Sequence, residues 1–424
     1  MYLHPGLFTK EVSTMDQKLR SHADAITAAA IRAVQPDAAV QRALLGQTFP
    51  GRVILVAAGK AAWQMAKAAC DCLGSRIEEG VVVTKYGHVM GPLPKIRCRE
   101  AGHPVPDENS FAGTRMALEL VSGLTEQDTV LFLLSGGGSA LFEDPLIPGE
   151  ELQDITNQLL SCGADIVEIN TIRKRLSRVK GGRFALHCAP ARVVSVVLSD
   201  IIGDPLDMIA SGPAVPDSST CTQALAIAEK YHLNLTPKAR GLLTQETPKV
   251  LSNVTTQITG SVRELCTAAA SACRELGYEP VILTDRLCCQ AREAGSFLAS
   301  IVKTHAASGK KLAFIAGGET VGKLTGTGKG GRNQEWALAA APGIAGIPGA
   351  AVFSIGSDGT DGPTDAAGGY VDSESASELA AQGISIHAAL ENNDTYHALK
   401  AVGGLIFTGP TGTNVNDVAV ALLE

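Results

Sequence analysis

Residues 135–139, Ser-Gly-Gly-Gly-Ser, follow directly on an uninterrupted apolar segment, TVLFLL at 129–134. A run of this kind without a charge is typical of a strand buried on both faces, as in the parallel sheet of an α/β protein. Three successive glycines lose much backbone entropy on folding, so we expect a reason for bare backbone there. Main-chain N–H groups at such a turn can cradle an anion, with Ser135 and Ser139 adding hydroxyls. The segment predicts a phosphate or carboxylate site, and the alternative is a tight turn that binds nothing.

Two basic residues stand at comparable turns. Lys60 follows a predicted strand at 52–58 and lies within AAGKAA. Because its neighbours are small and apolar, we expect its side chain to face a ligand site rather than solvent. Arg332 begins a predicted helix after the Gly-rich stretch 326–331, where a cation opposes the helix dipole unless an anion lies nearby. The alternative for Arg332 is a surface ion pair with Glu335 or another carboxylate.

Two aspartates, Asp200 and Asp358, each end an apolar strand in a Ser-Asp pair. Magnesium–nucleotide sites use one or two carboxylates together with phosphate oxygens, so both residues are candidate metal ligands. Asp200 is also a candidate base that would take a proton from a substrate hydroxyl. Helix capping or turn formation is the alternative for both. For His103, between Gly102 and Pro104, loop packing and catalysis both remain open.

Three familiar motifs are matched only superficially. Residues 317–323, GGETVGK, resemble a P-loop but lack the Ser or Thr that ligates magnesium. Residues 326–331, GTGKGG, match GxGxxG but follow a loop rather than a strand, so a dinucleotide fold is not predicted there. Ser139 lies in GGGSAL, which is not the GxSxG of serine hydrolases. Cations, anion-binding backbone and strand-end aspartates together favour phosphoryl transfer, which depends on positioning and charge neutralisation.

The composition sets the broad class. The chain has 424 residues, enough for two domains, and 45 glycines suit a loop-rich α/β protein. The net charge is −7 and no basic block is present, so we expect no nucleic-acid partner. Neither a signal peptide nor an apolar run long enough for a membrane span is recognised, so we expect no membrane association. The first ~20 residues have the composition of a loose extension.

The ten cysteines form no CxxC pair and no zinc spacing. We therefore expect most of them to be reduced and buried, which favours a cytoplasmic protein. The sequence does not determine the oligomeric state, and a homodimer is one arrangement compatible with it.

Strands and helices alternate along the chain, which predicts an α/β protein with a doubly wound parallel sheet in its N-terminal domain. Apolar strands run repeatedly into Gly, Ser or Asp loops, near residues 59, 135, 200, 317, 358 and 409. Ligands of open α/β sheets bind at the carboxyl ends of strands, so we expect one cleft between two domains. The predicted domains are a doubly wound domain at 20–235, which the resemblance described next implies to be Rossmann-like, and a smaller α/β domain at 254–424. The latter begins with a strand at 254–260 and ends with strand, loop and helix in GLIFTGPTGTNVNDVAVALL.

With these elements placed, long segments of the chain resemble the glycerate 2-kinase family that carries a C-terminal MOFRL domain. The resemblance runs from about Ile26 to the C-terminus. The segments that carry it are AAGKAAWQMAKAA (57–69), GHPVPDENS (102–110), LLSGGGSALFEDP (133–145), EINTIRKRLSRVKGGRFA (168–185), VVLSDIIGDPLDMIASGPAVPD (196–217), GGETVGKLTGTGKGGRNQEWAL (317–338), SDGTDGPTDAAGGYVD (357–372) and TGPTGTNVNDVAVAL (408–422).

The resemblance implies phosphorylation of D-glycerate at its 2-hydroxyl, with ATP and Mg²⁺, to give 2-phosphoglycerate and ADP. It implies that Lys60 holds the substrate carboxylate or the transferring phosphate, and that Arg332 stabilises charge on the γ-phosphate. Asp200 as base or metal ligand is our weaker inference, with Asp358 as a second metal ligand. We assign nucleotide or substrate binding to polar residues and glycines of these segments: Ser135, Gly136, Gly137, Gly138, Ser139, Arg173, Lys180, Glu319, Asn333, Glu335 and Asn414.

The chain departs from the family pattern at two places. Ser357 stands where threonine is commoner, which keeps a hydroxyl, and the residues after Glu319 are slightly irregular. Two other functions stay open: an NAD(P)H-dependent hydroxypyruvate reductase, a name sometimes given to this family, and a non-enzymatic protein that binds sugar acids or nucleotides.

Overall fold

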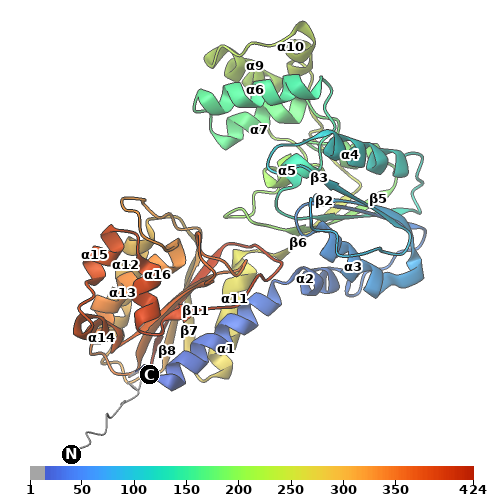
Figure 1. Cartoon of the computed structure of the whole chain (residues 1–424). Coiled ribbons are helices and arrows are strands. Elements are labelled where there is room, and N and C mark those ends of the chain that lie inside the picture. Colours follow the sequence, from blue (N-terminus) through green and yellow to red (C-terminus); the bar gives the residue numbers. More distant parts are fainter. Residues whose placement is uncertain (1–14) are drawn as a thin grey trace, which may run out of the picture. The chain divides into compact units, whose positions relative to one another are not determined.

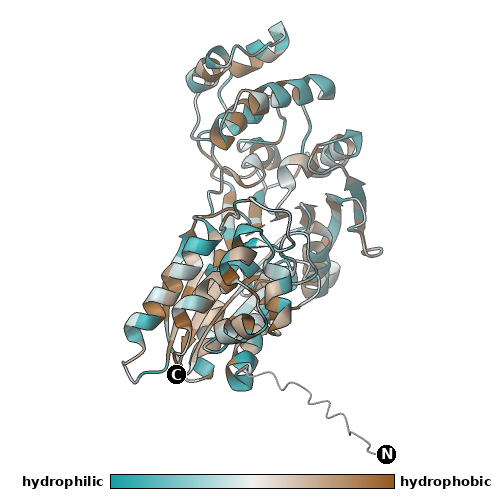
Figure 2. Cartoon of the chain, turned by 60° about the vertical axis from the view of Figure 1, so that its left-hand side comes forward, coloured by the Kyte–Doolittle hydropathy of each residue, from teal (hydrophilic) through white to brown (hydrophobic). Residues whose placement is uncertain are grey.

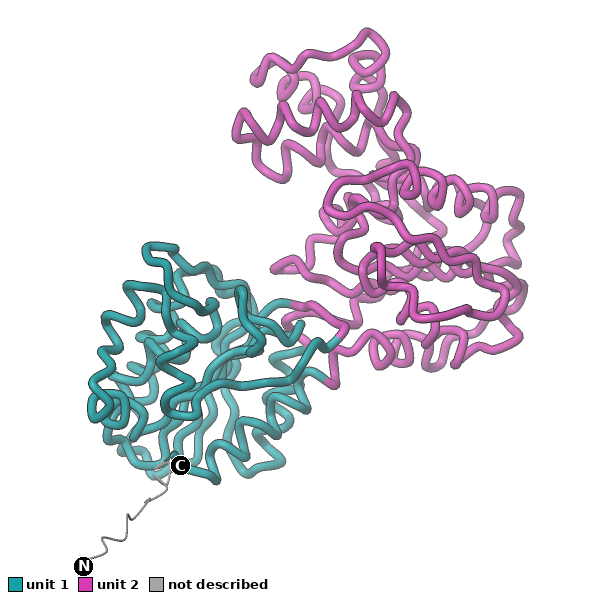
Figure 3. Tube along the Cα trace, in the orientation of Figure 1, with its two compact units in different colours: residues 1–31, 265–411, 416–424 teal, residues 32–264, 412–415 magenta. Residues whose placement is uncertain are grey.

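The computed structural model describes residues 15–424, and it divides into two compact units. Unit 1 comprises residues 1–31, 265–411 and 416–424, and unit 2 comprises residues 32–264 and 412–415 (Figure 3). Each unit is described by itself. Most of the N-terminal extension that we expected lies outside the described residues, although a helix already begins at Gln17.

Unit 2 is built on a parallel sheet. Within the described residues its six strands lie in the order β3 (Ile96–Ala101), β2 (Ile77–Lys85), β1 (Val53–Ala58), β4 (Thr129–Leu134), β5 (Arg192–Leu198) and β6 (Val254–Gly260). All neighbours are parallel, as the uninterrupted apolar runs predicted. This is the strand order of dinucleotide-binding folds, in which the chain reverses direction between β1 and β4.

Helices precede and connect the strands of unit 2. They are α2 (Pro36–Leu44), α3 (Ala62–Leu73), α4 (Glu108–Leu120), α5 (Gly138–Leu141), α6 (Gly149–Ser161), α7 (Ile166–Arg175), α8 (Arg183–Cys188), α9 (Cys221–Lys230) and α10 (Pro237–Leu243). Local chemistry sets several of the starts, because Asp107, Asp165 and Thr220 each cap a helix in a capping box. The helices carry both hydrophilic and hydrophobic residues, as amphipathic helices do (Figure 2).

Unit 2 has a second core beside the sheet. Helices α6, α7, α9 and α10 gather into a layer of their own (Figure 1). Their buried residues include Leu152, Ile172 and Ala224, which belong to one hydrophobic cluster, whereas the sheet packs in another with Phe132 and Phe184. The sheet and its covering helices therefore do not depend on this layer for their own core.

Unit 1 contains a mixed sheet. Among residues 15–424 it has six strands in the order β11 (Leu405–Ile406), β10 (Gly368–Asp372), β9 (Ala350–Gly356), β12 (Asp417–Leu423), β8 (Leu312–Gly318) and β7 (Glu279–Leu287). β7 and β8 are parallel, whereas β12 runs antiparallel to both β8 and β9. The helices are α1 (Gln17–Ala33), α11 (Val262–Glu275), α12 (Ala291–His305), α13 (Arg332–Ile344), α14 (Ser375–Ala381), α15 (Ile386–Glu391) and α16 (Thr395–Ala401).

Two predicted elements are corrected by the structure. Residues 417–423, expected as a C-terminal helix, form the central strand β12. All seven residues are buried, and the six that follow Asp417 are all apolar, so the run has no periodicity that separates strand from helix. Strand 254–260, expected in the second domain, is β6 and pairs with β5 of the first sheet. The doubly wound parallel sheet predicted for the N-terminal domain is confirmed, and β6 is its last strand.

The strand ends confirm the expected grouping of loops within each unit. The loops after β1, β4 and β5, near residues 59, 135 and 200, leave the same edge of the parallel sheet. In unit 1, β8 and β9 share an orientation because both oppose β12, so the loops near 317 and 358 leave one edge as well. The predicted cleft between the two domains stays a prediction.

Candidate active site

In unit 2 the predicted residues meet at the carboxyl ends of β1, β4 and β5. This is the point where the strand order reverses, and open α/β sheets bind ligands there. The glycine turn, residues 135–139, joins β4 to the short helix α5. Gly137 has φ +85°, a left-handed conformation that only glycine adopts at no cost. The turn therefore needs glycine for its shape as well as for access.

The glycine turn is tied to the end of β1 by main-chain hydrogen bonds. The Lys60 amide donates to the Gly136 carbonyl at 2.8 Å, and the Ala61 amide donates to Ser135 Oγ at 3.0 Å. A Cβ at Gly59 would lie 2.2 Å from Ser135 Oγ, so this contact also requires glycine. Ser135 is 3% exposed, which leaves its hydroxyl for internal structure. The two strand ends form one rigid platform.

Lys60 stands beside this platform. A Cβ added to Gly137 would lie 3.2 Å from Lys60 Cγ, so the lysine stem passes over the glycine. Among the hydrogen bonds and ion pairs of residues 15–424, none involves the Lys60 ammonium group. A half-buried lysine whose ammonium group has no hydrogen-bonded or ion-paired partner is available to bind an anion.

Asp200 lies on the other side of the turn. A Cβ at Gly136 would lie 2.1 Å from Asp200 Oδ2, so the carboxylate sits directly on the turn. Burial raises the pKa of Asp200, and the positive charge of Lys60 opposes that shift. The structure thus brings together Lys60, Asp200 and the glycines, three features that the sequence places more than 60 residues apart.

The far end of the glycine turn is held from behind by buried charges. The Ser139 carbonyl accepts hydrogen bonds from Lys180 Nζ at 2.8 Å and from Arg173 Nη2 at 3.0 Å. Lys180 also pairs with Glu143 Oε2 at 3.1 Å, and neither side chain is exposed. Burial lowers the pKa of Lys180 to about 8, with Glu143 opposing the shift. The Lys180 side chain therefore supports the turn by binding a backbone carbonyl of the turn. The Ser139 hydroxyl lies 3.2 Å from the Ser211 hydroxyl.

In unit 1, Arg332 begins α13 but faces a buried carboxylate. Its Nε and Nη2 donate to the two oxygens of Asp417 at 2.6 and 3.1 Å, a bidentate pair. Glu319 lies 3.4 Å from Nη1. Burial raises the pKa of Asp417, and Arg332 opposes it. Glu335 binds Arg292 at 3.1 Å instead, so the alternative of an ion pair for Arg332 is met by Glu319 and the buried Asp417 rather than by Glu335.

The first turn of α13 is capped from below by Asp361. Its two oxygens accept the backbone N–H groups of Asn333 at 3.0 Å and Gln334 at 2.8 Å. Burial raises the pKa of Asp361 to about 6, although these donors oppose it. The Asn333 side chain is 1% exposed and accepts a hydrogen bond from Ser354. Asn333 therefore serves the packing of α13 in this structure.

Asp358 and Asn414, the remaining predicted residues, lie in different surroundings. Asp358 Oδ1 accepts from the Thr360 amide at 3.0 Å, so its side chain closes the loop after β9. Asn414 is exposed, in the short segment 412–415 that belongs to unit 2. Within the described residues no group of three or more His, Cys, Asp or Glu residues is placed to hold a metal ion by itself.

The two glycine motifs of unit 1 are closed by internal contacts. The Asn393 side chain accepts from the Thr325 and Gly326 amides at 2.7 and 2.9 Å, and the Gly328 amide donates to the Asn392 carbonyl at 2.8 Å. No helix follows Lys323, as a P-loop requires. Both motifs therefore form a loop that packs on the α15–α16 turn, as the sequence context indicated.

His103 is the residue at this site for which the sequence left loop packing and catalysis both open. It follows β3, and the Cδ2 and Nε2 atoms of its ring lie 3.0 Å from where a Cβ of Gly137 would stand. Burial lowers its pKa, as does the nearby charge of Lys60. The sequence did hold one indication of its place at the site. His103 lies in GHPVPD, which follows a strand directly, as the other site loops do.

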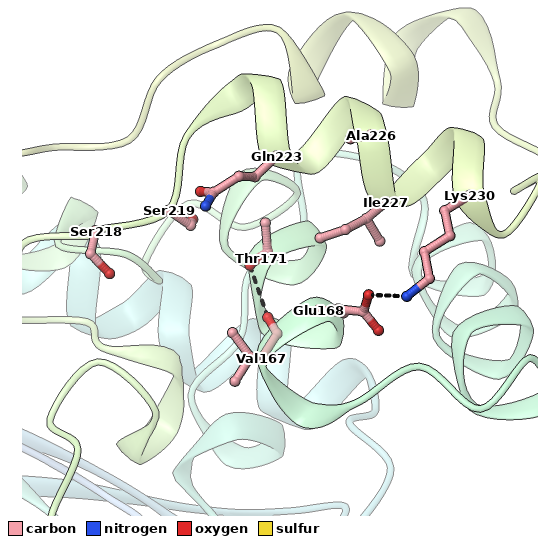
Figure 4. Close-up of a pocket in the computed structure, with 9 residues that line it drawn as sticks. All are labelled: Val167, Glu168, Thr171, Ser218, Ser219, Gln223, Ala226, Ile227 and Lys230. Carbon is pink, nitrogen blue, oxygen red and sulfur yellow. Dashed lines mark hydrogen bonds and ion pairs between the residues drawn. The ribbon is translucent and has the colours of Figure 1, made fainter.

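A pocket of about 420 Å³ lies elsewhere in unit 2, between α7 and α9 (Figure 4). Glu168 and Lys230 form an ion pair of 2.6 Å across it, and Thr171 donates to the Val167 carbonyl at 2.8 Å. None of the predicted site residues lines this pocket. Its labelled polar side chains are largely satisfied within the protein, and it carries no assigned chemistry.

All ten cysteines fall in the described part of the chain and are free thiols, but only Cys188, Cys266 and Cys273 are buried. The prediction that most are buried is therefore wrong. No helix in residues 15–424 combines the length and apolarity that a membrane crossing needs.

Comparison with known proteins places these features in a family. Residues 22–244 match the domain of unknown function DUF4147, and residues 312–417 match the MOFRL family. A D-glycerate 2-kinase from Thermotoga maritima is 54% identical, with 96% of this chain and 99% of that protein covered. A glycerate 2-kinase from Pyrococcus horikoshii is 42% identical over 88% of both proteins.

A crystal structure of a glycerate kinase from Thermotoga maritima superposes with a TM-score of 0.93 at 53% identity, covering 96% of this chain and all of that one. A putative hydroxypyruvate reductase from Agrobacterium vitis is 39% identical, over 88% of this chain and 100% of that protein. The domain pair, the fold and these identities agree with the resemblance found in the sequence. The chain belongs to the glycerate 2-kinase family, with a DUF4147 domain followed by a MOFRL domain.

Proposed function

We propose that this protein transfers the γ-phosphoryl group of ATP to the 2-hydroxyl of D-glycerate, giving 2-phosphoglycerate and ADP. Relatives at 54% and 42% identity are named as enzymes of this activity. The observation that carries the proposal is the meeting of Lys60, Asp200 and the glycine turn at one edge of the parallel sheet.

In this reaction the 2-hydroxyl oxygen attacks the γ-phosphorus and loses its proton. The bond between that phosphorus and the β–γ bridging oxygen breaks, and its electron pair leaves with ADP. The protein contributes positioning and charge stabilisation rather than covalent chemistry. Lys60 would bind the glycerate carboxylate or the transferring phosphate, because its ammonium group has no carboxylate partner among residues 15–424.

The glycine turn would contribute main-chain N–H groups and close access to bound phosphate or substrate. Arg332 would stabilise negative charge on the γ-phosphate. Arg332 would then exchange part of its pairing with Asp417 for phosphate oxygens, which the same planar guanidinium can bind bidentately.

The residues present fit Mg²⁺ only when it is bound together with the nucleotide, whose phosphates would supply the remaining ligands. It keeps several waters and binds one or two carboxylates plus phosphates, and Asp200 and Asp358 are strand-end carboxylates of this kind. When bound, the ion would neutralise charge on the β- and γ-phosphates. Asp200 is the better ligand, because Asp358 is engaged in its own turn.

The product distinguishes this proposal from its variants. Purified protein is incubated with ATP, Mg²⁺ and D-glycerate, and the phosphorylated product is identified by phosphorus NMR against standards of both isomers. We expect 2-phosphoglycerate. Formation of 3-phosphoglycerate would contradict the stated position of transfer, and no product would contradict the activity.

Hydroxypyruvate reduction is the second candidate, because a relative carries that name and the sheet has the dinucleotide-binding strand order. Against it, the first strand-to-helix turn has one glycine, Gly59, where dinucleotide binding uses three. NADH or NADPH oxidation with hydroxypyruvate tests this directly. Turnover there, with none for ATP and glycerate, would replace the kinase proposal.

A further inference from the structure

His103 lies inside the group of residues that the proposed reaction uses. Its ring atoms Cδ2 and Nε2 are both 3.0 Å from the position that a Cβ of Gly137 would occupy, and Lys60 Cγ is 3.2 Å from the same point. A histidine and a lysine therefore share the face of the turn that Gly137 leaves open. Asp200 contacts the neighbouring residue, Gly136, in the same way.

The ring nitrogens of His103 are not used by the protein. Among the hydrogen bonds and ion pairs of residues 15–424, none involves His103. The nearby His88 differs, because its Nδ1 is 2.9 Å from the Lys60 carbonyl. The His103 imidazole is partly exposed, and its nitrogens have no hydrogen-bond partner in the protein. It lies beside glycines that have no side chains, so it is placed to hydrogen-bond a ligand.

The charges that face His103 favour its neutral form. Burial lowers its pKa most, followed by the positive charge of Lys60 at the end of β1. Lys85 and His88, at the end of β2, act in the same direction. The carboxylate of Asp200 lies across the turn, on the Gly136 side. At neutral pH the imidazole is therefore an acceptor of protons, and it remains one to a lower pH than an ordinary histidine.

We propose that His103 is a further catalytic residue, which accepts a hydrogen bond from the 2-hydroxyl of the substrate and takes its proton as the oxygen attacks the γ-phosphorus. This inference rests on the proposed kinase function. The oxygen–phosphorus bond forms as the β–γ bridging bond breaks, and the proton moves from the hydroxyl to an imidazole nitrogen. Asp200 is then left to the metal, which resolves the two roles that the sequence left open for it.

The test compares His103→Gln with wild type and with His187→Gln, a matched change of an exposed histidine on α8. ATP-dependent formation of 2-phosphoglycerate by wild type is measured first, so that failure of the kinase proposal is seen separately. We expect kcat of His103→Gln to fall about 10²–10⁴-fold, as for loss of a general base, with KM for glycerate changed less than about threefold. His187→Gln should match wild type.

The pH profile separates catalysis from packing. In wild type, kcat/KM should decline on the acid side with an apparent pKa below the ordinary 6.5 of histidine, because protonated His103 cannot accept the proton. This decline should be absent from the residual activity of His103→Gln. Wild-type kcat in His103→Gln would overturn the proposal, and so would an acid limb that the variant retains.

Two further measurements keep the test valid if His103→Gln folds poorly. Wild type alone must show the acid limb at saturating Mg²⁺, so a flat wild-type profile between about pH 5 and pH 8 would refute the assignment. Added imidazole should restore part of the activity of His103→Ala, with a rise that follows the neutral form of imidazole. A folded His103→Ala that is inactive and not rescued would count against proton transfer.

Discussion

The two glycine-rich loops of the protein use glycine for different purposes. In unit 2, residues 135–139 lie at the end of a parallel strand, and the space above their glycines is filled by Asp200, His103 and Lys60. In unit 1, the glycines at 326, 328 and 330 pack against residues 392–395. The first loop makes room for side chains from other strand ends, whereas the second packs on a neighbouring turn.

The cation beside each loop shows the same contrast. The Lys60 ammonium forms no hydrogen bond or ion pair within the described residues, but Arg332 forms a bidentate pair with the buried Asp417. A cation without an ion-pair partner can bind a ligand but contributes little to folding. A cation paired with a buried carboxylate also contributes to folding, because its removal leaves that carboxylate unpaired.

The largest effect should follow from Lys60→Ala. We expect kcat/KM for D-glycerate to fall about 10³-fold, because a cation that neutralises transferring phosphate or holds the substrate is lost. The melting temperature should stay within a few degrees of wild type. The matched control is Lys67→Ala on α3, where the lysine pairs with Asp71 at the surface. Unchanged phosphorylation in Lys60→Ala would remove the basis of the proposed site.

Arg332→Met should lower both activity and stability. We expect a loss of kcat/KM of about 10²–10³-fold and a loss of about 2 kcal/mol in the free energy of unfolding, below the range for fully buried pairs because Arg332 is 34% exposed. The double variant Arg332→Met/Asp417→Asn should recover part of the stability in urea unfolding and none of the activity. Full stability in the single variant would show that the bidentate pair is not structural.

Gly136→Ala and Gly322→Ala compare the loop at 135–139 with a glycine that lies just before the loop at 326–331. An alanine Cβ at 136 would lie 2.1 Å from Asp200 Oδ2, whereas at 322 its nearest neighbour is Glu335 Oε2 at 3.6 Å, an ordinary contact. We expect Gly136→Ala to lose about 10²-fold in kcat/KM, since the carboxylate must move, and Gly322→Ala to stay within about threefold. Steady-state kinetics of both variants measure these losses. Equal losses of kcat/KM would refute the proposed difference between the two glycines.

The prediction with the smallest effect on activity concerns how the stability of unit 1 depends on pH. The folded pKa of Asp361, about 6, lies above the ordinary 3.8. Its contribution to stability is therefore full below about pH 4 and is lost as pH rises through 6. The difference in unfolding free energy between wild type and Asp361→Asn should be about 2 kcal/mol larger at pH 4 than at pH 7.5. A difference that is independent of pH would show that Asp361 does not titrate in this range.

The sequence predicted much of the site, since Lys60, Asp200 and residues 135–139 all end apolar strands. Parallel strands end at the same edge of a sheet, so residues that follow different parallel strands are expected to lie close together. The partners of Arg332 and the role of Lys180 were not predictable in this way. They depend on buried carboxylates, Asp417 and Glu143, that are distant in sequence and belong to no spacing rule.

The sequence by itself determined the α/β class, the strand-end loops and the family, because these depend on local apolar runs, glycines and long motifs. Only the tertiary structure decided that residues 417–423 are a central antiparallel strand, and that 254–260 complete the first sheet. It also placed His103 over Gly137. Strand pairing and side-chain contact are long-range, and a short apolar run or a lone histidine carries no local signal for either.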